Sequence, residues 1–421
     1  MKICTVEFAG VKFKLGNVKS GKENIQVVES MLRKYLKHAE NVSKMVIFEE
    51  TYSFTPDGLK ASTRQQRLKT EKQRDVDHSK PTATFLNEST FNTEVVTKAE
   101  AGKRMITTYM AVNCTSLVLD RDIKVVIDSE LYKSKQCSCT PHPCGSSSGQ
   151  CDCREYCESI WVQFISHDGC KTDPPCVIRE KVVQQCKREA EMAVVDWLVY
   201  YRDLLQAGDY VICFVTPGDI DAICIHLFAL SWHWKREENA KFKNNVYVEL
   251  QKPYGKSDIY NITALLELFE EFFKDNMIGC KIAIALCIGG NDFIPKCYQL
   301  SHDTVLKPMF DNLHFRKNLI SFVNGKVQLN SELCIEFKKT LLCPKRLRHL
   351  KLSYDEVRAE TIEKSQDESK GSCRTCDPRK WLPPRSSIER LGSLIQLQIE
   401  YLCTAGVHDA HLPIFLGSNC L

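Results

Sequence analysis

The chain has 421 residues, of which 43% are hydrophobic and 26% are charged, and its formal net charge is +4. This composition is ordinary for a globular protein with a substantial core and excludes a disordered chain. The length allows one large domain or two to three ordinary ones. The net charge is too small to indicate nucleic-acid binding by itself.

No apolar run reaches the roughly 20 residues that a membrane helix needs. The start, "MKICTVEFAGVKFK", also lacks the sustained apolar stretch of a secretory signal. We therefore expect no membrane insertion and an intracellular location, nuclear or cytoplasmic. The 22 cysteines then become informative. In a reducing compartment, clustered cysteines bind zinc more often than they form disulfides.

Helically spaced apolar residues and short apolar runs predict the elements of the chain. In chain order we expect a helix at 23–40, a strand at 44–50, a helix at 93–112, a strand at 122–130, a helix at 188–205, a strand at 210–215 with a second apolar segment to 230, a strand at 245–251, a helix at 262–273, a strand at 281–288 and a helix at 387–406. Alternating strands and helices predict an α/β fold with a mainly parallel central sheet.

Composition predicts how these elements are grouped. Residues 131–176 are rich in Cys, Ser, Gly and Pro and lack periodicity, which predicts an insertion. The α/β domain then comprises residues 1–130 and 177–325. Residues 326–421 are expected to form a helical C-terminal extension, with a polar linker at 363–372.

Acidic residues occur where such a sheet would place a site. Glu189 and Glu191 begin a predicted helix, Asp219 and Asp221 follow a predicted strand on a Pro-Gly turn, and Asp292 follows another on a Gly-Gly turn. If the Pro-Gly turn is extended, its two aspartates point the same way. Sites in open α/β sheets lie beyond the carboxyl ends of the strands. We therefore expect these five carboxylates to converge.

Converging carboxylates repel one another unless cations hold them together. Carboxylate-rich sites with few His or Cys ligands suit Mg²⁺ or Mn²⁺. Two such ions can activate a water molecule and stabilise the leaving oxygen of a phosphodiester. The alternative for each acid is a solvated helix cap or turn residue.

Four segments carry a resemblance to a nuclease superfamily. "REAEMAVVDWL", "TPGDIDAICIHL" and "GGNDFIP" resemble the Gly-Glu-x-Glu helix, the Asp-x-Asp strand end and the Gly-Asn-Asp-Phe-Leu-Pro segment of Xrn-type 5′→3′ exonucleases. The last also resembles the Gly-x-Asp-Tyr motif of flap endonucleases. "VIFEETYSFTPDGLKASTRQQR" resembles the strand, Asp-Gly, Pro, Lys and Gln-Gln-Arg segment of these families.

The resemblance extends from about residue 20 to about residue 320, in the order of the families. It implies a PIN-like (5′-nuclease, XPG-type) three-layer fold and a two-metal nuclease that acts on DNA or RNA, at 5′ ends or flaps. The catalytic metal ligands that it implies are Glu189, Glu191, Asp219, Asp221 and Asp292.

Residues 58–80 carry seven Lys or Arg side chains against three acids. In a helix, Lys60, Arg64 and Arg67 would share one face. The resemblance implies that this segment, with Gln65, contacts the phosphates near the scissile bond. Guanidinium groups match phosphate oxygens in a bidentate manner, which makes this role chemically reasonable. The alternative is a solvated polar face.

The chain departs from the families at its N-terminal acids. The families place an Asp on the first strand and another in an Asp-Gly after the second. Here Glu7 is the only acid on the first stretch, and Glu49 and Glu50 follow "VIF" as weaker candidate metal ligands. A longer side chain displaces the carboxylate oxygens, and small displacements can cost catalysis heavily. Either the chain is an N-terminally shortened form, or the fold has lost part of its chemistry. A catalytically degenerate PIN-like protein that binds nucleic acid or protein partners is therefore the alternative.

The predicted insertion holds cysteines in the pattern C-x-C-x4-C-x6-C-x-C-x3-C, together with His142. Tetrahedral zinc needs four thiolate or imidazole ligands, and metal can fold a loop that is poor in apolar residues. The expected structural Zn²⁺ ligands are Cys137, Cys139, Cys144, Cys151, Cys153, Cys157, Cys170 and Cys176. Disulfides in an oxidising compartment are the alternative. Cys373 and Cys376 lack an obvious second pair, and we expect no site there.

Overall fold

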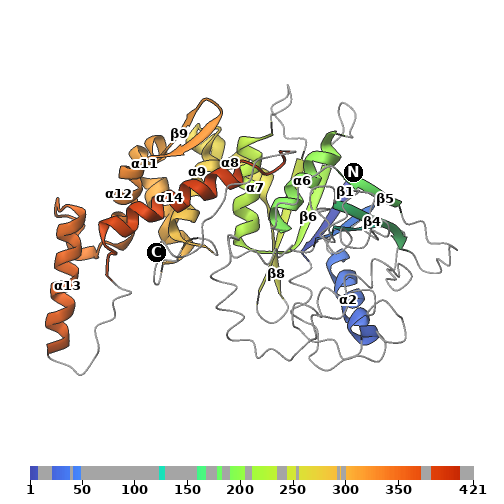
Figure 1. Ribbon diagram of the computed structural model, residues 1–421, viewed down its shortest axis with the longest axis horizontal. Helices are drawn as coiled ribbons and strands as arrows, with labels where there is room; N and C mark the ends of the chain where they lie inside the picture. Colours follow the sequence, from blue (N-terminus) through green and yellow to red (C-terminus); the bar gives the residue numbers. More distant parts are fainter. Residues whose placement is uncertain are drawn as a thin grey trace, which may run out of the picture.

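The computed structural model describes most of the predicted α/β domain and the C-terminal region (Figure 1). The described residues are 1–7, 21–37, 41–48, 123–128, 159–166, 178–182, 190–203, 211–234, 244–252, 256–291, 294, 300–370 and 381–407. The expected helix at 93–112 lies outside them.

A sheet of eight described strands runs through the molecule in the order β5-β4-β3-β2-β1-β6-β7-β8. The strands are β1 (Lys2–Glu7), β2 (Lys44–Phe48), β3 (Ile123–Asp128), β4 (Ser159–Ser166), β5 (Ile178–Val182), β6 (Val211–Gly218), β7 (Asn244–Gln251) and β8 (Ser257–Asn261). Strands β3, β2, β1, β6 and β7 form consecutive parallel pairs, whereas β4, β5 and β8 pair antiparallel. The expected α/β fold with a mainly parallel sheet is confirmed.

Helices lie on both faces of this sheet. One face, which carries Ile3, Cys213 and Val248, belongs to the same apolar core as the helices α6 (Ala190–Asp203), α7 (Ile220–Trp232) and α8 (Ile262–Phe273). The opposite face meets α2 (Gly21–Leu36), where the hydroxyl of Tyr35 accepts a 3.3 Å hydrogen bond from the Gln251 amide of β7. Burial on both faces explains the nearly continuous apolar runs of the central strands.

Most expected elements are confirmed with shifts of a few residues at their ends. Helices α2, α6, α8 and α14 and strands β2, β3, β6 and β7 occupy the expected positions, and the second apolar segment after β6 is the helix α7. A helix or strand that buries one face repeats its apolar residues at the period of that element. Spacing in the sequence therefore identifies such elements well.

The expected strand at 281–288 is wrong, because this run lies within the helix α9 (Ile278–Gly289). All twelve residues of α9 are buried, and helices α7, α8, α10, α12 and α14 surround it. A helix that is buried on every side is apolar on every side, so periodicity cannot distinguish it from a buried strand.

Helix α9 packs closely against α7 at Gly279. A Cβ atom at this position would lie 2.6 Å from the carbonyl oxygen of Leu227 and would also collide with the hydroxyl of Ser231. Glycine therefore allows the two helix backbones to approach. This contact fixes α9 against the helix that follows β6.

The C-terminal half adds helices and a hairpin to the same core. Its elements are α10 (His302–Asp311), α11 (Leu313–Asn318), β9 (Ile320–Val323), β10 (Lys326–Leu329), α12 (Ser331–Leu342), a 3₁₀ turn (Lys345–Leu347), α13 (Tyr354–Lys370) and α14 (Arg385–Leu402). Asn324 and Gly325 both have positive φ, 50° and 71°, as the tight turn between β9 and β10 requires. Figure 1 shows α13 at the far end of the molecule from the sheet.

Three features of the structure lie at the expected boundaries. The boundary between residues 325 and 326 falls within the β9–β10 hairpin, and apolar residues from Ile3 to Ala405 form one core. The expected linker at 363–372 is helical as far as Lys370. Strand β4 lies inside the expected insertion 131–176 but pairs with β3 of the main sheet. Composition identifies polar stretches of the chain. Sheet pairing and core packing decide which segments fold together.

No helix within the described ranges combines the length and the apolar character that crossing a membrane would require.

Candidate functional site

The sheet has a topological switch point between β1 and β6. The chain runs outward from β1 to β2 and β3 on one side, and β6 and β7 then extend the sheet on the other side. Ligands of open α/β sheets bind beyond the carboxyl ends of the strands at such a point. Strand β1 ends at Glu7 and β6 at Gly218. We call this place the carboxyl edge of β1 and β6.

Asp219 and Asp221 connect β6 to α7 at this edge. Asp219 is the N-cap of α7, with extended backbone (φ −136°, ψ −171°), and its Oδ1 accepts a 2.9 Å hydrogen bond from the N–H of Ala222. Asp221 lies in the first helical turn. Successive helical residues rotate by about 100° around the axis. The strand alternation expected for the two aspartates is therefore wrong, because the extended conformation ends at Asp219.

The first turn of α7 lies beside the last turn of α9. Burial raises the pKa of the Cys287 thiol, and the negative charge of Asp221 raises that pKa further. Burial likewise raises the pKa of the Cys224 thiol. The nearby groups Cys287, Asp221 and Asp219 raise this pKa further, in decreasing order of effect. These electrostatic interactions require proximity, so the end of α9 approaches the acids that follow β6.

The "GGND" segment begins at Gly289, the last residue of α9. Gly290 has a φ of 105°, a conformation that favours glycine. Asn291 then donates its backbone N–H to the carbonyl of Ile294 at 3.0 Å, and its side-chain oxygen accepts from the N–H of Ile294 at 3.0 Å. Asp292 lies outside the described residues.

Helix α6 brings Glu191 to the same edge of the sheet. The ring of Trp197 contacts that of Phe48 at the end of β2, with centroids 6.4 Å apart. One turn later, Tyr201 lies under the ammonium group of Lys44 at the start of β2, 4.2 Å from its ring centroid. The helix therefore runs antiparallel to β2. Its first turn, with the 8% exposed Glu191, points toward the carboxyl edge.

Glu7, the acid of the first strand, ends β1 and pairs with Phe48 at the end of β2. It therefore lies at the carboxyl edge, although it is one methylene longer than the aspartate of the resembled families. Glu191, Asp221 and Glu7 each make interactions with other groups. Asp219 is exposed, and within the described residues its Oδ2 makes no hydrogen bond.

The remaining expected site residues lie outside the described residues. These are Glu189, Glu49, Glu50, Asp292, Lys60, Arg64, Gln65, Arg67, Cys137, Cys139, Cys144, Cys151, Cys153, Cys157, Cys170 and Cys176. The structure therefore places acids from β1, α6 and the β6–α7 junction along the same edge of the sheet, and the other expected residues stay predictions.

The donor chemistry of this edge suits a hard divalent cation, since its described acids offer only carboxylate oxygens. Asp219 retains an oxygen beyond the one that caps α7. Within the described ranges, no three His, Cys, Asp or Glu side chains are grouped closely enough to hold a metal ion. A ligand set at this edge would therefore include at least one residue outside the described ranges, such as Glu189, Asp292, Glu49 or Glu50.

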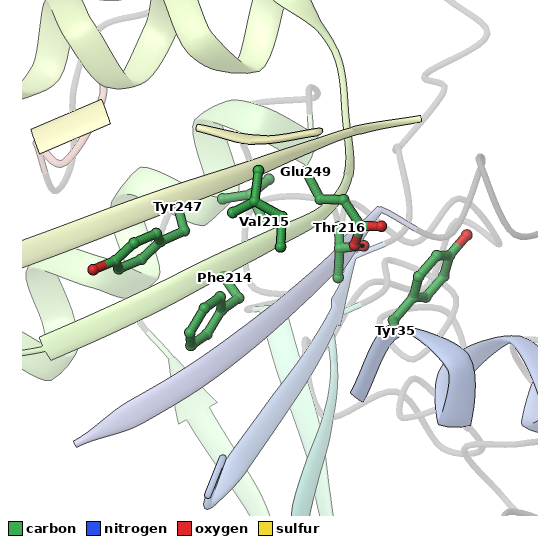
Figure 2. Close-up of a pocket in the computed structure, with 7 residues that line it drawn as sticks. Tyr35, Phe214, Val215, Thr216, Tyr247 and Glu249 are labelled. Atoms are coloured by element: carbon green, nitrogen blue, oxygen red, sulfur yellow. Dashed lines mark hydrogen bonds between the residues drawn. The ribbon is translucent and has the colours of Figure 1, made fainter. Parts of the chain in front are cut away.

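Sequence reasoning did not identify Glu249 of β7 or Thr216 of β6. Glu249 is buried, and its Oε2 accepts a 2.7 Å hydrogen bond from the hydroxyl of Thr216 (Figure 2). Both side chains lie on the sheet face that meets α2, near the ends of their strands. The available signal was a glutamate on an otherwise apolar alternating strand, "NVYVELQ".

A comparison with models of protein families finds no match for this chain, and a search of curated proteins finds none either. The functional interpretation therefore rests on the residues themselves and on where the fold places them.

Proposed function

We propose that this protein is a divalent-metal-dependent nuclease with a PIN-like (5′-nuclease) three-layer fold, which hydrolyses phosphodiester bonds of DNA or RNA. The observation that carries the proposal is the placement of Glu7, Glu191, Asp219 and Asp221 at the carboxyl edge of β1 and β6. Three segments far apart in the sequence supply these acids. A topological switch point is also where an open α/β sheet binds its ligand.

The chain's own residues have distinct roles in this proposal. Glu191, Asp219 and Asp221, with Glu189 and Asp292, would hold Mg²⁺ or Mn²⁺, which supplies an activated water when bound. The cap hydrogen bond from Ala222 fixes the carboxylate of Asp219 at the start of α7. A carboxylate that is already oriented needs little reorganisation to bind a cation.

The proposal extends to the two segments that sequence alone supports. Lys60, Arg64, Gln65 and Arg67 would contact the phosphate backbone of the nucleic acid. The cysteines of residues 131–176 would bind structural Zn²⁺. Support for the phosphate contacts comes from the resemblance and from the match of guanidinium groups to phosphate oxygens, and support for the zinc site comes from the spacing of the cysteines.

A catalytically degenerate PIN-like protein that binds nucleic acid or protein is the second candidate. The observation that favours it is Glu7, because the resembled families carry an aspartate on the first strand. Glu7 is the last residue of β1, one of the two strands at the switch point. The longer glutamate side chain therefore displaces the carboxylate at the switch point itself. This candidate retains binding and lacks hydrolysis.

A cleavage assay separates the two candidates. Single-stranded and flap substrates with 5′ phosphates, made of DNA or RNA, are incubated with Mn²⁺ and either wild-type protein or Asp219→Asn. Asparagine keeps the cap hydrogen bond and removes the charge. We expect Asp219→Asn to lose activity by about a hundredfold or more.

The matched control is Asp303→Asn, because Asp303 is an exposed acid in the first turn of α10, another helix. It should leave cleavage unchanged. Equal cleavage by the wild type and Asp219→Asn would reject the proposed site. Wild-type protein that binds these substrates without cleaving them supports the second candidate.

A further inference from the structure

A small cavity lies on the sheet face that meets α2, between the ends of β6 and β7 and the last turn of the helix (Figure 2). Its lining includes Tyr35, Phe214, Thr216, Tyr247, Glu249 and Ile259. Figure 2 shows the oxygens of Glu249 and Thr216 side by side, with Tyr35 across from them. Among the lining residues, Glu249 is 7% exposed and Ile259 is 45% exposed. The cavity therefore has a route to solvent.

Glu249 is a buried carboxylate with one neutral partner. The hydroxyl of Thr216 donates to its Oε2 at 2.7 Å. Among the described residues, no ammonium, guanidinium or imidazolium group forms an ion pair with Glu249. Removing a carboxylate from water costs free energy unless a cation or several hydrogen bonds compensate. The cavity beside Glu249 is the place where such a cation can bind.

Aromatic rings complete the lining. Phe214 and Tyr247 are stacked, with centroids 5.1 Å apart and an interplanar angle of 21°. The hydroxyl of Tyr35 accepts a 3.3 Å hydrogen bond from Gln251, which holds this ring at the other side of the cavity. Burial raises the pKa of Tyr35 to about 12, so the ring is a neutral phenol at physiological pH. Neutral aromatic rings attract cations through their electron-rich faces.

The volume of the cavity limits the cation that fits. The space open to the centre of a water-sized sphere is about 10 Å³, enough for one group of that size. The –NH₃⁺ group has nearly the dimensions of a water molecule. Planar guanidinium and quaternary ammonium groups are several times larger and would collide with the rings.

We propose that this cavity binds a primary ammonium group, which pairs with Glu249 and contacts the surrounding aromatic rings. The group could belong to a free primary amine or to a lysine side chain, which share the same chemistry. This inference is separate from the proposed nuclease activity, because it concerns the opposite sheet face and none of the acids of the carboxyl edge.

The test is a titration of full-length protein with ¹³C-methylammonium, followed by the line width of the methyl signal. We expect saturable broadening with wild-type protein. Glu249→Gln preserves the shape of the side chain and its acceptor for Thr216, and should weaken binding about tenfold or more, because a charged hydrogen bond is lost. Tyr35→Leu keeps the carboxylate and removes one ring, and should weaken binding about threefold.

The matched control is Glu271→Gln, since Glu271 is an exposed carboxylate on α8, and this variant should bind like the wild type. Guanidinium and tetramethylammonium should not compete with methylammonium. The capped peptide N-acetyl-Gly-Lys-Gly-amide, compared with its norleucine analogue, identifies the source: tighter binding than methylammonium assigns the site to lysine side chains, and weaker binding assigns it to free amines.

Three results would overturn the proposal. If wild-type protein caused no saturable broadening of the methylammonium signal and did not bind the lysine peptide, the cavity would hold water only. Equal binding by Glu249→Gln, with its fold verified by circular dichroism, would remove the carboxylate from the site. Equal competition by guanidinium would exclude a pocket of this size.

Discussion

Asp196 of α6 accepts a 2.6 Å hydrogen bond from the backbone N–H of Gly406, which lies 210 residues later in the chain. Asp196 is 6% exposed, and Gly406 has a φ of 73°. This bond joins the helix that carries Glu191 to the turn that follows α14. The C-terminal region therefore stabilises the position of an acid at the candidate site.

Replacing Asp196 should destabilise the protein through this bond. We expect Asp196→Ala to lower the free energy of unfolding by about 1–3 kcal/mol, because a buried N–H group loses its acceptor. Asp196→Asn retains an acceptor oxygen and should lose less. Urea denaturation followed by circular dichroism measures both variants. An alanine variant as stable as the wild type would contradict the structural role of this bond.

The cap at Asp219 allows stability to be separated from activity. Asp219→Ala removes the acceptor of the Ala222 N–H and should cost about 1 kcal/mol of unfolding free energy. Asp219→Asn should be nearly neutral, since asparagine caps helices as well as aspartate does. Thermal unfolding of the two variants, beside the cleavage assay, measures the difference. If both variants were equally unstable, lost activity could not be attributed to the charge.

His226 should make the protein less stable in acid. It lies on α7, it is fully buried, and among the described residues neither ring nitrogen has a hydrogen-bond partner. Burial lowers the pKa of His226 from its ordinary value of 6.5 to about 4. The folded state therefore holds the neutral imidazole, while the unfolded chain binds a proton below pH 6.5.

The stabilisation due to neutral His226 is complete above pH 6.5 and is lost as the pH falls from 6.5 through about 4. This interval corresponds to about 3 kcal/mol. Unfolding free energies measured between pH 7 and 4 should fall less steeply for His226→Leu than for the wild type. Parallel curves for the two proteins would show that His226 does not titrate as its burial implies.

Gly279 should be intolerant of a side chain. Gly279→Ala places a Cβ against the α7 backbone and should cost about 1–3 kcal/mol, because the two helices must separate. Gly392 of α14 is the matched control, as a Cβ there meets nothing within 4 Å. Gly392→Ala should be neutral or stabilising by about 0.5–1 kcal/mol. Midpoints of thermal unfolding measure both, and equal shifts would contradict the close contact of α7 with α9.

Zinc content tests the insertion. Protein purified under reducing conditions and analysed by atomic emission should contain at least one zinc per chain, since four ligands suffice for one tetrahedral site. Removal of the metal with a chelator should lower the unfolding temperature, because binding free energy contributes to folding. Less than one zinc per chain would reject the proposed site.

The sequence by itself determined most of the secondary structure and the α/β class. Helices α2 and α6 and strands β2 and β7 carry their apolar residues at the period of the element, so local spacing suffices to predict them. The same reasoning placed acids directly after β6 and at the start of α6. The apolar spacing and the positions of the acids are both properties of short segments. A sequence pattern therefore suffices to predict them.

Only the tertiary structure decided the relations between segments. The strand order creates the switch point at β1 and β6. The apolar run 281–288 is part of the helix α9, which five other helices surround. Glu249 became a cavity residue because β6 and α2 cover it from segments far away in the chain. Burial and pairing depend on which distant segments meet, and the residues of a single segment do not contain that information.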